Sequence, residues 1–352
     1  MISLNDLLKL TVEKGASDLH LTVGLPPVLR INKELVFVGE ERLTPEDTAE
    51  MLFSIMRDDQ KKAFKEKREY DFSFGLKGLA RFRINVFYQR GSVAAAFRRI
   101  PFEIPALDSL GVPKIAHDII EHERGFVLVT GPTGHGKSTT LAAMIDEINM
   151  KKSKHIITIE DPIEYLFQHK RSVIVQRELG SDTFSFPNAL RAALREDPDV
   201  ILVGEMRDYE TMATALTAAE TGHLVFATLH TNSAAQSIDR IVDVFPPHQQ
   251  AQVKAQLAAV LLATFSQQLI PRADNNGLVL ATEVLIATPA VRNLIREGKT
   301  FQIPSLIQTG ADIGMQTMEQ SLKTLVNKGM ITYEQGIRYA FNKDSFVNLM
   351  GR

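Results

Sequence analysis

A glycine-rich run with a lysine near its end has the spacing of a phosphate-binding loop. The run consists of Gly131, Pro132, Thr133, Gly134, His135, Gly136, Lys137 and Ser138, and Thr139 follows it. The glycines let backbone N–H groups turn inward around an anion, and the N-terminus of a following helix adds its dipole. A chance glycine-rich turn is the alternative, but a β-rich run precedes the loop and a helical segment follows it, as this motif requires.

The residues of this loop predict a nucleotide and a metal ion as ligands. In phosphate loops the lysine contacts the β- and γ-phosphates of ATP, and the hydroxyl that follows it holds Mg²⁺. We therefore expect residues 131–139 to bind ATP, with Lys137 as the phosphate cation and Ser138 as a metal ligand.

Polar side chains also follow three further β-rich runs in the same region. They are Glu160, Asp161 and Glu164 after residues 155–159, Glu205 after 200–203, and His230 after the run that begins at 224. In open parallel sheets, ligands bind beyond the carboxyl ends of the strands. These side chains and the phosphate loop should therefore meet at one edge of a sheet.

Each of these side chains suits a step in ATP hydrolysis. We expect Glu205 to act as a Walker B acid that steadies Mg²⁺ and its water. Glu164 reaches past its strand and would act as the general base for the attacking water, with Glu160 and Asp161 as alternatives. His230 would donate to the γ-phosphate and report its presence, and a structural role is the alternative for this histidine.

Two arginines nearer the N-terminus are candidates for completing the site. Residues 80–86 alternate with period two, which predicts a strand with Arg81 and Arg83 on one face. Two positive charges on one face repel each other unless an anion neutralises them. We expect both arginines to act in trans on the nucleotide of a neighbouring subunit, with a solvated strand edge as the alternative. Arg98 is a weaker third candidate.

The elements that position these groups form two regions of different pattern. Residues 1–99 predict short alternating strands and amphipathic helices, and 100–113, with three prolines, predict a linker. Residues 114–352 alternate β-rich runs with helices, which predicts an α/β domain with a parallel sheet and right-handed crossovers. From about residue 289 the chain should be helical.

The segment 289–297 predicts a short surface helix. Thr288 suits its N-cap and Gly298 its stop. Arg292 and Arg296 lie four residues apart and would leave a basic ridge unless Glu297 or a partner offsets it. We expect this ridge to contact a partner rather than the nucleotide.

Composition excludes several classes of site. The 40 basic and 42 acidic residues nearly balance, which argues against a protein built to hold nucleic acid. The absence of cysteine excludes disulfides, thiolate zinc sites and thiol catalysis. No run approaches the roughly 20 apolar residues that cross a bilayer, and the first residues do not resemble a signal peptide. We therefore expect a cytoplasmic protein without direct membrane insertion.

Taken together, these motifs resemble those of a known superfamily. Residues 131–138, 158–164, 202–208 and 222–230 resemble the Walker A, Asp box, Walker B and His box of the secretion ATPases. Residues 289–297 resemble the signature of the type IV pilus retraction ATPases within it, and 15–21 resemble that group's N-terminal region. His135 and Val291 depart from the group, which usually has serine and isoleucine at these positions.

This resemblance implies an architecture, cofactors and partners. It implies a PAS-like N-terminal domain, a RecA-like P-loop domain, and a homohexameric ring that binds ATP and Mg²⁺ between subunits. Arg83, through the Arg-Phe-Arg motif, matches the second finger arginine, with Arg81 beside it. The expected partner is an inner-membrane pilus platform protein, which would place the chain at the cytoplasmic face of that membrane.

Three rival functions remain open at this stage. A pilus extension or type II secretion ATPase is usually longer and carries a four-cysteine metal insertion, whereas this chain has no cysteine. A RecA-like nucleic-acid translocase would need a basic channel. A scaffold that binds ATP without hydrolysing it would release no phosphate.

Overall fold

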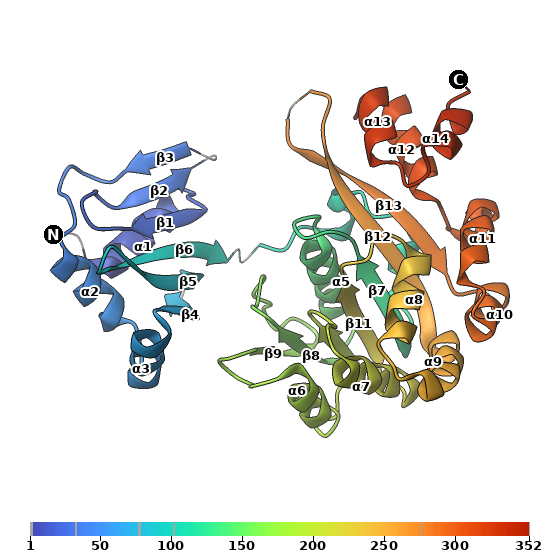
Figure 1. Cartoon of the computed structure of the whole chain (residues 1–352), viewed down its shortest axis with the longest axis horizontal. Coiled ribbons are helices and arrows are strands. Elements are labelled where there is room, and N and C mark those ends of the chain that lie inside the picture. Colours follow the sequence, from blue (N-terminus) through green and yellow to red (C-terminus); the bar gives the residue numbers. More distant parts are fainter. Residues whose placement is uncertain (1–2, 32–33, 77–78, 101–102, 275, 352) are drawn as a thin grey trace. The chain divides into compact units, whose positions relative to one another are not determined.

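The computed structural model divides into two compact units (Figure 1). It describes residues 3–31, 34–76, 79–100, 103–274 and 276–351. One unit comprises Met1–Glu103 and Glu164–Leu166, and the other comprises Ile104–Ile163 and Phe167–Arg352. Residues 101 and 102 of the expected linker lie outside the described residues, whereas Leu107 and Val112 are buried in the core of the second unit.

The described residues of the first unit form an antiparallel sheet accompanied by helices α1, α2 and α3. The strands lie in the order β3-β2-β1-β6-β5-β4. Their bounds are β1 (Asp18–Leu21), β2 (Val28–Ile31), β3 (Glu34–Phe37), β4 (Glu69–Leu76), β5 (Ala80–Gln89) and β6 (Ser92–Ile100). The helices are α1 (Leu4–Glu13), α2 (Pro45–Ser54) and α3 (Asp58–Lys67). The strand predicted at residues 80–86 is confirmed as part of β5, which pairs with β6 from Gln89 and Ser92 outward.

The second unit is built on a sheet of mostly parallel strands. The order is β13-β12-β7-β11-β10-β8-β9; among the strands of the described residues, β12 and β13 pair antiparallel and the other neighbours pair in parallel. The bounds are β7 (Gly125–Thr130), β8 (His155–Glu160), β9 (Val173–Glu178), β10 (Val200–Val203), β11 (Leu224–Leu229), β12 (Leu261–Pro271) and β13 (Leu278–Ile286). The α/β prediction is confirmed, and β7, β8, β10 and β11 lie at the runs that predicted them.

Helices cover both faces of this sheet (Figure 1). Successive strand residues point to opposite faces, so Phe126 and Leu128 pack in one core and Val127 and Val129 in the other. The 3₁₀ turn η1 (Leu107–Leu110), α4 (Ile115–Ile119) and α5 (Lys137–Lys151) cover the face of Val127. The other face is covered by α6 (Phe186–Ala193), α7 (Tyr209–Glu220), α8 (Ala234–Asp243) and α9 (Pro247–Val260).

The C-terminal part is helical, as expected from the sequence. It contains α10 (Pro289–Glu297), η2 (Thr300–Gln302), α11 (Ile303–Thr309), η3 (Ala311–Ile313), α12 (Met318–Asn327), α13 (Tyr333–Tyr339) and α14 (Lys343–Leu349). The last three helices form a small core with Ile270 of β12 and Ala281 of β13. Thr332 and Gln335 form a capping box at the start of α13.

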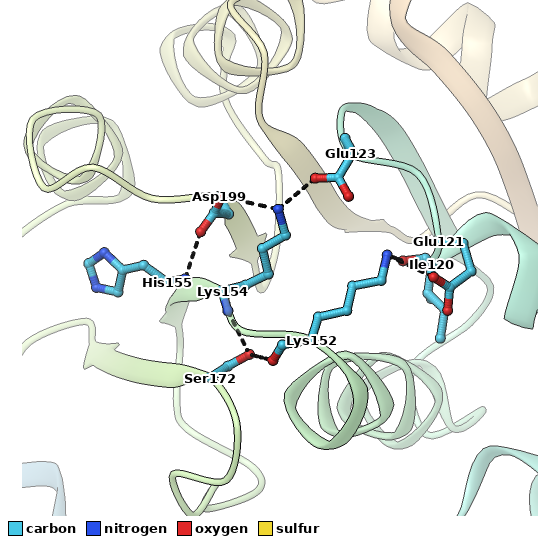
Figure 2. A network of polar contacts seen from close by, with 8 residues as sticks. All are labelled: Ile120, Glu121, Glu123, Lys152, Lys154, His155, Ser172 and Asp199. Atoms are coloured by element: carbon cyan, nitrogen blue, oxygen red, sulfur yellow. Dashed lines mark hydrogen bonds and ion pairs between the residues drawn. The ribbon is translucent and has the colours of Figure 1, made fainter.

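A polar network aligns the amino ends of the parallel strands (Figure 2). The Lys154 ammonium lies 2.5 Å from the Glu123 carboxylate, just before β7, and 3.4 Å from Asp199, just before β10. Asp199 in turn accepts a hydrogen bond of 2.8 Å from the backbone N–H of His155, at the start of β8. Because the strands start in register, their carboxyl ends emerge together at the opposite edge of the sheet.

Candidate active site

The phosphate loop joins β7 to α5 and lies close against β12. Gly131, Gly134 and Gly136 have φ of 140°, 79° and 79°, in the region that other residues rarely adopt. A Cβ atom at Gly131 would lie 2.4 Å from the carbonyl oxygen of Gln267 in β12. The loop therefore needs glycine both for its backbone angles and for its approach to the sheet. The following helix of 15 residues supplies unpaired N-terminal amides to bind an anion.

Lys137 is buried at the first position of α5, inside the curve of the loop. Its ammonium donates to the carbonyl oxygens of Gly131 at 2.7 Å and Pro132 at 2.9 Å. The same nitrogen lies 3.5 Å from Nδ1 of His230. Ser138 and Thr139 occupy the rest of the first helical turn, half-buried. The loop thus presents a cation, amides and a hydroxyl at one place.

His230 lies between the phosphate loop and Glu205. Its Nδ1 is 3.4 Å from the Thr133 hydroxyl, and its Nε2 is 3.0 Å from Oε1 of Glu205. The two residues follow the neighbouring strands β11 and β10, whose parallel pairing brings their carboxyl ends together. The expectation that the phosphate loop, Glu205 and His230 meet at one edge of the sheet agrees with this arrangement.

The Glu205 carboxylate is also held by Arg207. The arginine donates from Nε at 2.5 Å and from Nη2 at 2.6 Å, which makes a bidentate salt bridge. Burial by itself raises the pKa of Glu205, but the hydrogen bond from Arg207 and the charges of Arg207 and His230 outweigh it and hold the pKa below its usual value. Glu205 is therefore a carboxylate at neutral pH, suited to a cation or to orienting water. Arg207 lies within residues 202–208, which resemble the Walker B motif, but the sequence alone gave it no role; its position two residues after Glu205 was the available signal.

The acidic residues after β8 lie in different surroundings. Glu160 ends the strand and is buried, and its Oε1 accepts from the Thr158 hydroxyl at 2.6 Å and the Gln176 amide at 3.3 Å. A Cβ atom at Gly204 would lie 3.1 Å from the Glu160 Cα. The backbone of Glu160 therefore packs closely against Gly204, the residue before Glu205. Glu164 is exposed in the loop beyond, and its role as a base remains a prediction.

Comparison with known proteins agrees with this geometry. The family model described as "Type II/IV secretion system protein" matches residues 2–289. The chain belongs to this family. It is 49% identical over 345 residues to the "Type IV pilus retractation ATPase PilT" of Pseudomonas aeruginosa, covering 98% of this chain and 100% of that protein. It is 53% identical over 319 residues to the "Twitching motility protein" of Neisseria gonorrhoeae, covering 91% and 85% respectively.

A solved structure is similar over nearly the whole fold. The crystal structure of the pilus retraction motor PilT with bound ADP has a TM-score of 0.91 and 53% sequence identity, and the match covers 98% of this chain and 99% of that chain. The resemblance predicted from the motifs is therefore confirmed, and with it the prediction of a secretion-type ATPase.

The first unit of this family member carries the two candidate finger arginines. Phe82 and Ile84 of β5 are buried, while Arg81 is half-buried and Arg83 is exposed, as the alternation predicted. The Nε of Arg83 lies 3.9 Å from a carboxylate oxygen of Asp71 on β4, with both side chains about half exposed. An acidic neighbour within the chain thus reduces the charge repulsion on which the trans role was argued, and that role stays a prediction.

The third candidate arginine has a partner of its own. Arg98 donates to Asp18 at 3.0 Å, across the β1–β6 pairing. This pair ties two strands of the first unit together, so the structure shows a local contact for Arg98.

The predicted helix α10 has the expected caps, but one of its arginines does not lie on the surface ridge. Thr288 accepts from Val291 N as N-cap, and Gly298 ends the helix with φ of 69°. Arg292 is half-buried and donates to backbone carbonyl oxygens at 2.5–2.9 Å, namely those of Ala258, Ala259, Leu261 and Ala287. The basic-ridge prediction is therefore wrong for Arg292, because the last carbonyls of α9 take up its guanidinium; Arg296 is exposed.

Proposed function

We propose that this chain is a Mg²⁺-dependent ATPase motor that acts as a homohexamer and powers type IV pilus retraction and twitching motility. The observation that carries the proposal is the cluster of Lys137, His230 and Glu205 at the carboxyl edge of the parallel sheet. A cation, a histidine and a carboxylate beside a phosphate loop suit binding and hydrolysis of a nucleoside triphosphate. The relatives whose names refer to pilus retraction and twitching support the mechanical output.

The residues present fit ATP and Mg²⁺. The loop amides and Lys137 suit the β- and γ-phosphates. Mg²⁺ prefers oxygen ligands and keeps several waters, so one hydroxyl and one carboxylate with the phosphates are enough to hold it. Ser138 in the first turn of α5 would supply the hydroxyl, and the ionised Glu205 the carboxylate. The metal would neutralise charge on the phosphates during transfer.

In this proposal the remaining predicted residues have distinct tasks. Glu164 activates the attacking water, and His230 links the γ-phosphate region to Glu205. Arg81 and Arg83 act on the nucleotide of the adjacent subunit in the ring.

The output would be delivered to an inner-membrane pilus platform protein, by resemblance to the retraction ATPases. Among the residues that the structure describes, no helix combines the length and the apolar composition that crossing a bilayer requires. We place the motor at the cytoplasmic face of the inner membrane, held there through its partner.

The test joins ATP turnover to motility. Purified wild-type chain should release phosphate from ATP with Mg²⁺, and Lys137→Ala should lose both nucleotide binding and turnover. Replacing the gene by the Lys137→Ala form should abolish twitching, whereas Lys328→Ala, an exposed lysine after α12, should change neither readout. A wild-type chain without turnover would refute the ATPase. Turnover combined with loss of pilus assembly in a gene deletion would favour the extension ATPase instead.

A further inference from the structure

The middle of the phosphate loop is tied to β12 by the side chain of His135. The backbone N–H of Leu269 donates to Nδ1 of His135 at 3.0 Å. The residues on either side, Gly134 and Gly136, are both left-handed, and a Cβ atom at Gly136 would lie 3.4 Å from Leu269. The ring therefore points toward the sheet, and the loop follows β12 from Gln267 to Leu269.

The topology explains why this hydrogen bond exists. β7 and β12 pair in parallel as far as Thr130 and Ser266, and beyond this point β7 turns into the phosphate loop. The N–H of Leu269, three residues further along β12, is therefore beyond the reach of a partner in β7. The Leu269 N–H is part-buried, and an N–H of this kind without an acceptor loses free energy; the imidazole nitrogen takes the place of the missing strand carbonyl.

Other contacts to β12 hold the elements beside the loop. The Thr130 hydroxyl donates to Ser266 at 2.9 Å at the end of β7. The Gln267 amide donates to the Thr140 hydroxyl at 2.7 Å, in the first turns of α5. His135 supplies a corresponding attachment between these two points, at the centre of the loop.

The chemistry of the ring sets a condition on this attachment. Nδ1 accepts a hydrogen bond only when it carries no proton, so the ring must be neutral with its hydrogen on Nε2. Burial, and then the charge of Lys137 in the same loop, lower the pKa of His135. Leu269, its partner on β12, carries no charge. The neutral form is therefore the one present at neutral pH.

We propose that His135 is a positioning residue for the nucleotide, a neutral imidazole that fastens the phosphate loop to β12 so that the loop amides stay aimed at the phosphates. His135 belongs to the run 131–139 that was expected to bind ATP, but its ring contacts the sheet. The inference rests on the proposed ATPase only in its kinetic arm. The proposal predicts that His135 affects the affinity for ATP. A misplaced loop would weaken binding of the substrate and of the transition state equally, so KM changes more than kcat.

The kinetic test compares side chains with and without an acceptor at the Nδ1 position. His135→Leu fills the space without an acceptor and should raise KM for ATP about three- to tenfold, the range of one neutral hydrogen bond, with a much smaller effect on kcat. In His135→Asn, Oδ1 can stand near the place of Nδ1, so this variant should recover most of the affinity. An exposed histidine, His248→Leu, is the matched control. Equal KM for the Leu and Asn variants would overturn the proposal.

The pH profile adds a readout that a purely structural role would not change. Protonation of His135 would break the bond, so kcat/KM of the wild type should fall relative to the Asn variant as the pH drops below the usual pKa of an imidazole, which burial and Lys137 lower further in His135. Taking the ratio of the two profiles cancels the titration of ATP itself. Parallel profiles would contradict the requirement for a neutral ring.

Hydrogen exchange tests the attachment without relying on turnover. The Leu269 amide should exchange faster in His135→Leu than in the wild type and in His135→Asn, while the amide of Phe265, which lies in β12 between β7 and β13, should stay protected. Unchanged Leu269 exchange in a folded Leu variant would refute the attachment. A wild type that lacks turnover but shows this difference would reject the proposed function and keep the attachment.

Discussion

The Glu205 carboxylate contacts two side chains in the folded chain, those of Arg207 and His230. Arg207 binds both of its oxygens, and His230 lies 3.0 Å from one of them. His230 also reaches Thr133 and Lys137 of the phosphate loop through its other nitrogen. A change at the phosphates can therefore be passed through one imidazole to Glu205.

The choice of general base is a prediction at the scale of single residues. Glu164→Gln should keep ATP binding and lose about 10²–10⁴-fold in turnover, as expected for a general base. Glu160→Gln should lose less, because the Glu160 carboxylate is already occupied by Thr158 and Gln176 and glutamine keeps an acceptor there. Turnover and nucleotide affinity are measured for both variants. The reverse order of losses would move the base to Glu160.

A buried carboxyl group outside the site predicts how stability depends on pH. Glu283 on β13 is 6% exposed and accepts a hydrogen bond of 2.8 Å from the backbone N–H of Ala234, at the start of α8. Burial raises its pKa to about 7; the bond from Ala234 lowers it, and the nearby Glu319 adds to the rise. The folded chain thus binds this proton more tightly than the unfolded chain.

The sign of the effect follows from proton linkage. Since the folded pKa exceeds the unfolded value, this group's stabilising contribution is lost as the pH rises from about 4.5 to about 7, by at most about 3 kcal/mol. Glu283→Gln keeps an acceptor for Ala234 and removes the charge. As the pH rises from about 4.5 to about 7, the melting temperature of Glu283→Gln should fall less than that of the wild type. Parallel melting curves for the two proteins would contradict this assignment.

At the scale of elements, α10 is joined to α9 by a side chain rather than by apolar packing alone. Val291 and Ile295 are buried in the core, while Arg292 caps the carbonyl end of α9. A cation at this end of a helix satisfies unpaired carbonyl oxygens and opposes the helix dipole. The segment that resembles the retraction signature is thus part of the folded unit.

This arrangement predicts different effects for the two arginines of α10. Arg292→Ala should destabilise the chain by about 2–3 kcal/mol, because the removed hydrogen bonds involve a charged donor, and should lower the melting temperature by several degrees. Arg296→Ala, at an exposed position, should leave melting unchanged and test any partner contact through twitching. Thermal melting of both proteins is the measurement. Equal melting temperatures for the two variants would contradict the stabilising contact of Arg292 and favour its placement on the surface ridge.

At the scale of the whole molecule, the candidate groups are divided between two units. The phosphate loop, Glu205 and His230 belong to the second unit, and Arg81 and Arg83 to the first. In the proposed ring, each nucleotide is served by two chains, so a defect in either set of groups disables every site of a uniform hexamer.

Mixing two inactive variants tests this division. Arg83→Ala supplies an intact phosphate loop and Lys137→Ala supplies intact arginines, so mixed rings should contain some complete sites and recover part of the turnover. Each variant alone should be nearly inactive. The measurement is the ATPase rate against mixing ratio, with ring assembly checked by light scattering. Absence of recovery in assembled mixed rings would argue against a trans role.

Local patterns in the sequence were sufficient for the features whose causes are local. The phosphate loop was found because its glycine spacing and the helix after it lie within one short segment. The caps of α10 at Thr288 and Gly298, and the strand at residues 80–86, were likewise confirmed. In contrast, β12 and β13 were missed, because both are largely buried and β12 carries the polar Ser266 and Gln267 inside the core, so neither strand has the alternation of a half-exposed strand.

Only the tertiary structure decided which of these groups meet. His230 contacts Glu205 because β11 lies beside β10, an order that no local pattern encodes. Arg292 was expected at the surface because the sequence shows which face of its helix it occupies. The sequence does not show that the end of α9 covers that face. His135 and Leu269 are 134 residues apart, and their bond exists because β7 leaves β12 at the phosphate loop. The sequence by itself determined the chemical groups and the helices and strands that carry them. The order of the strands determined which groups meet, because strands pair when segments far apart in the sequence bury their apolar side chains together.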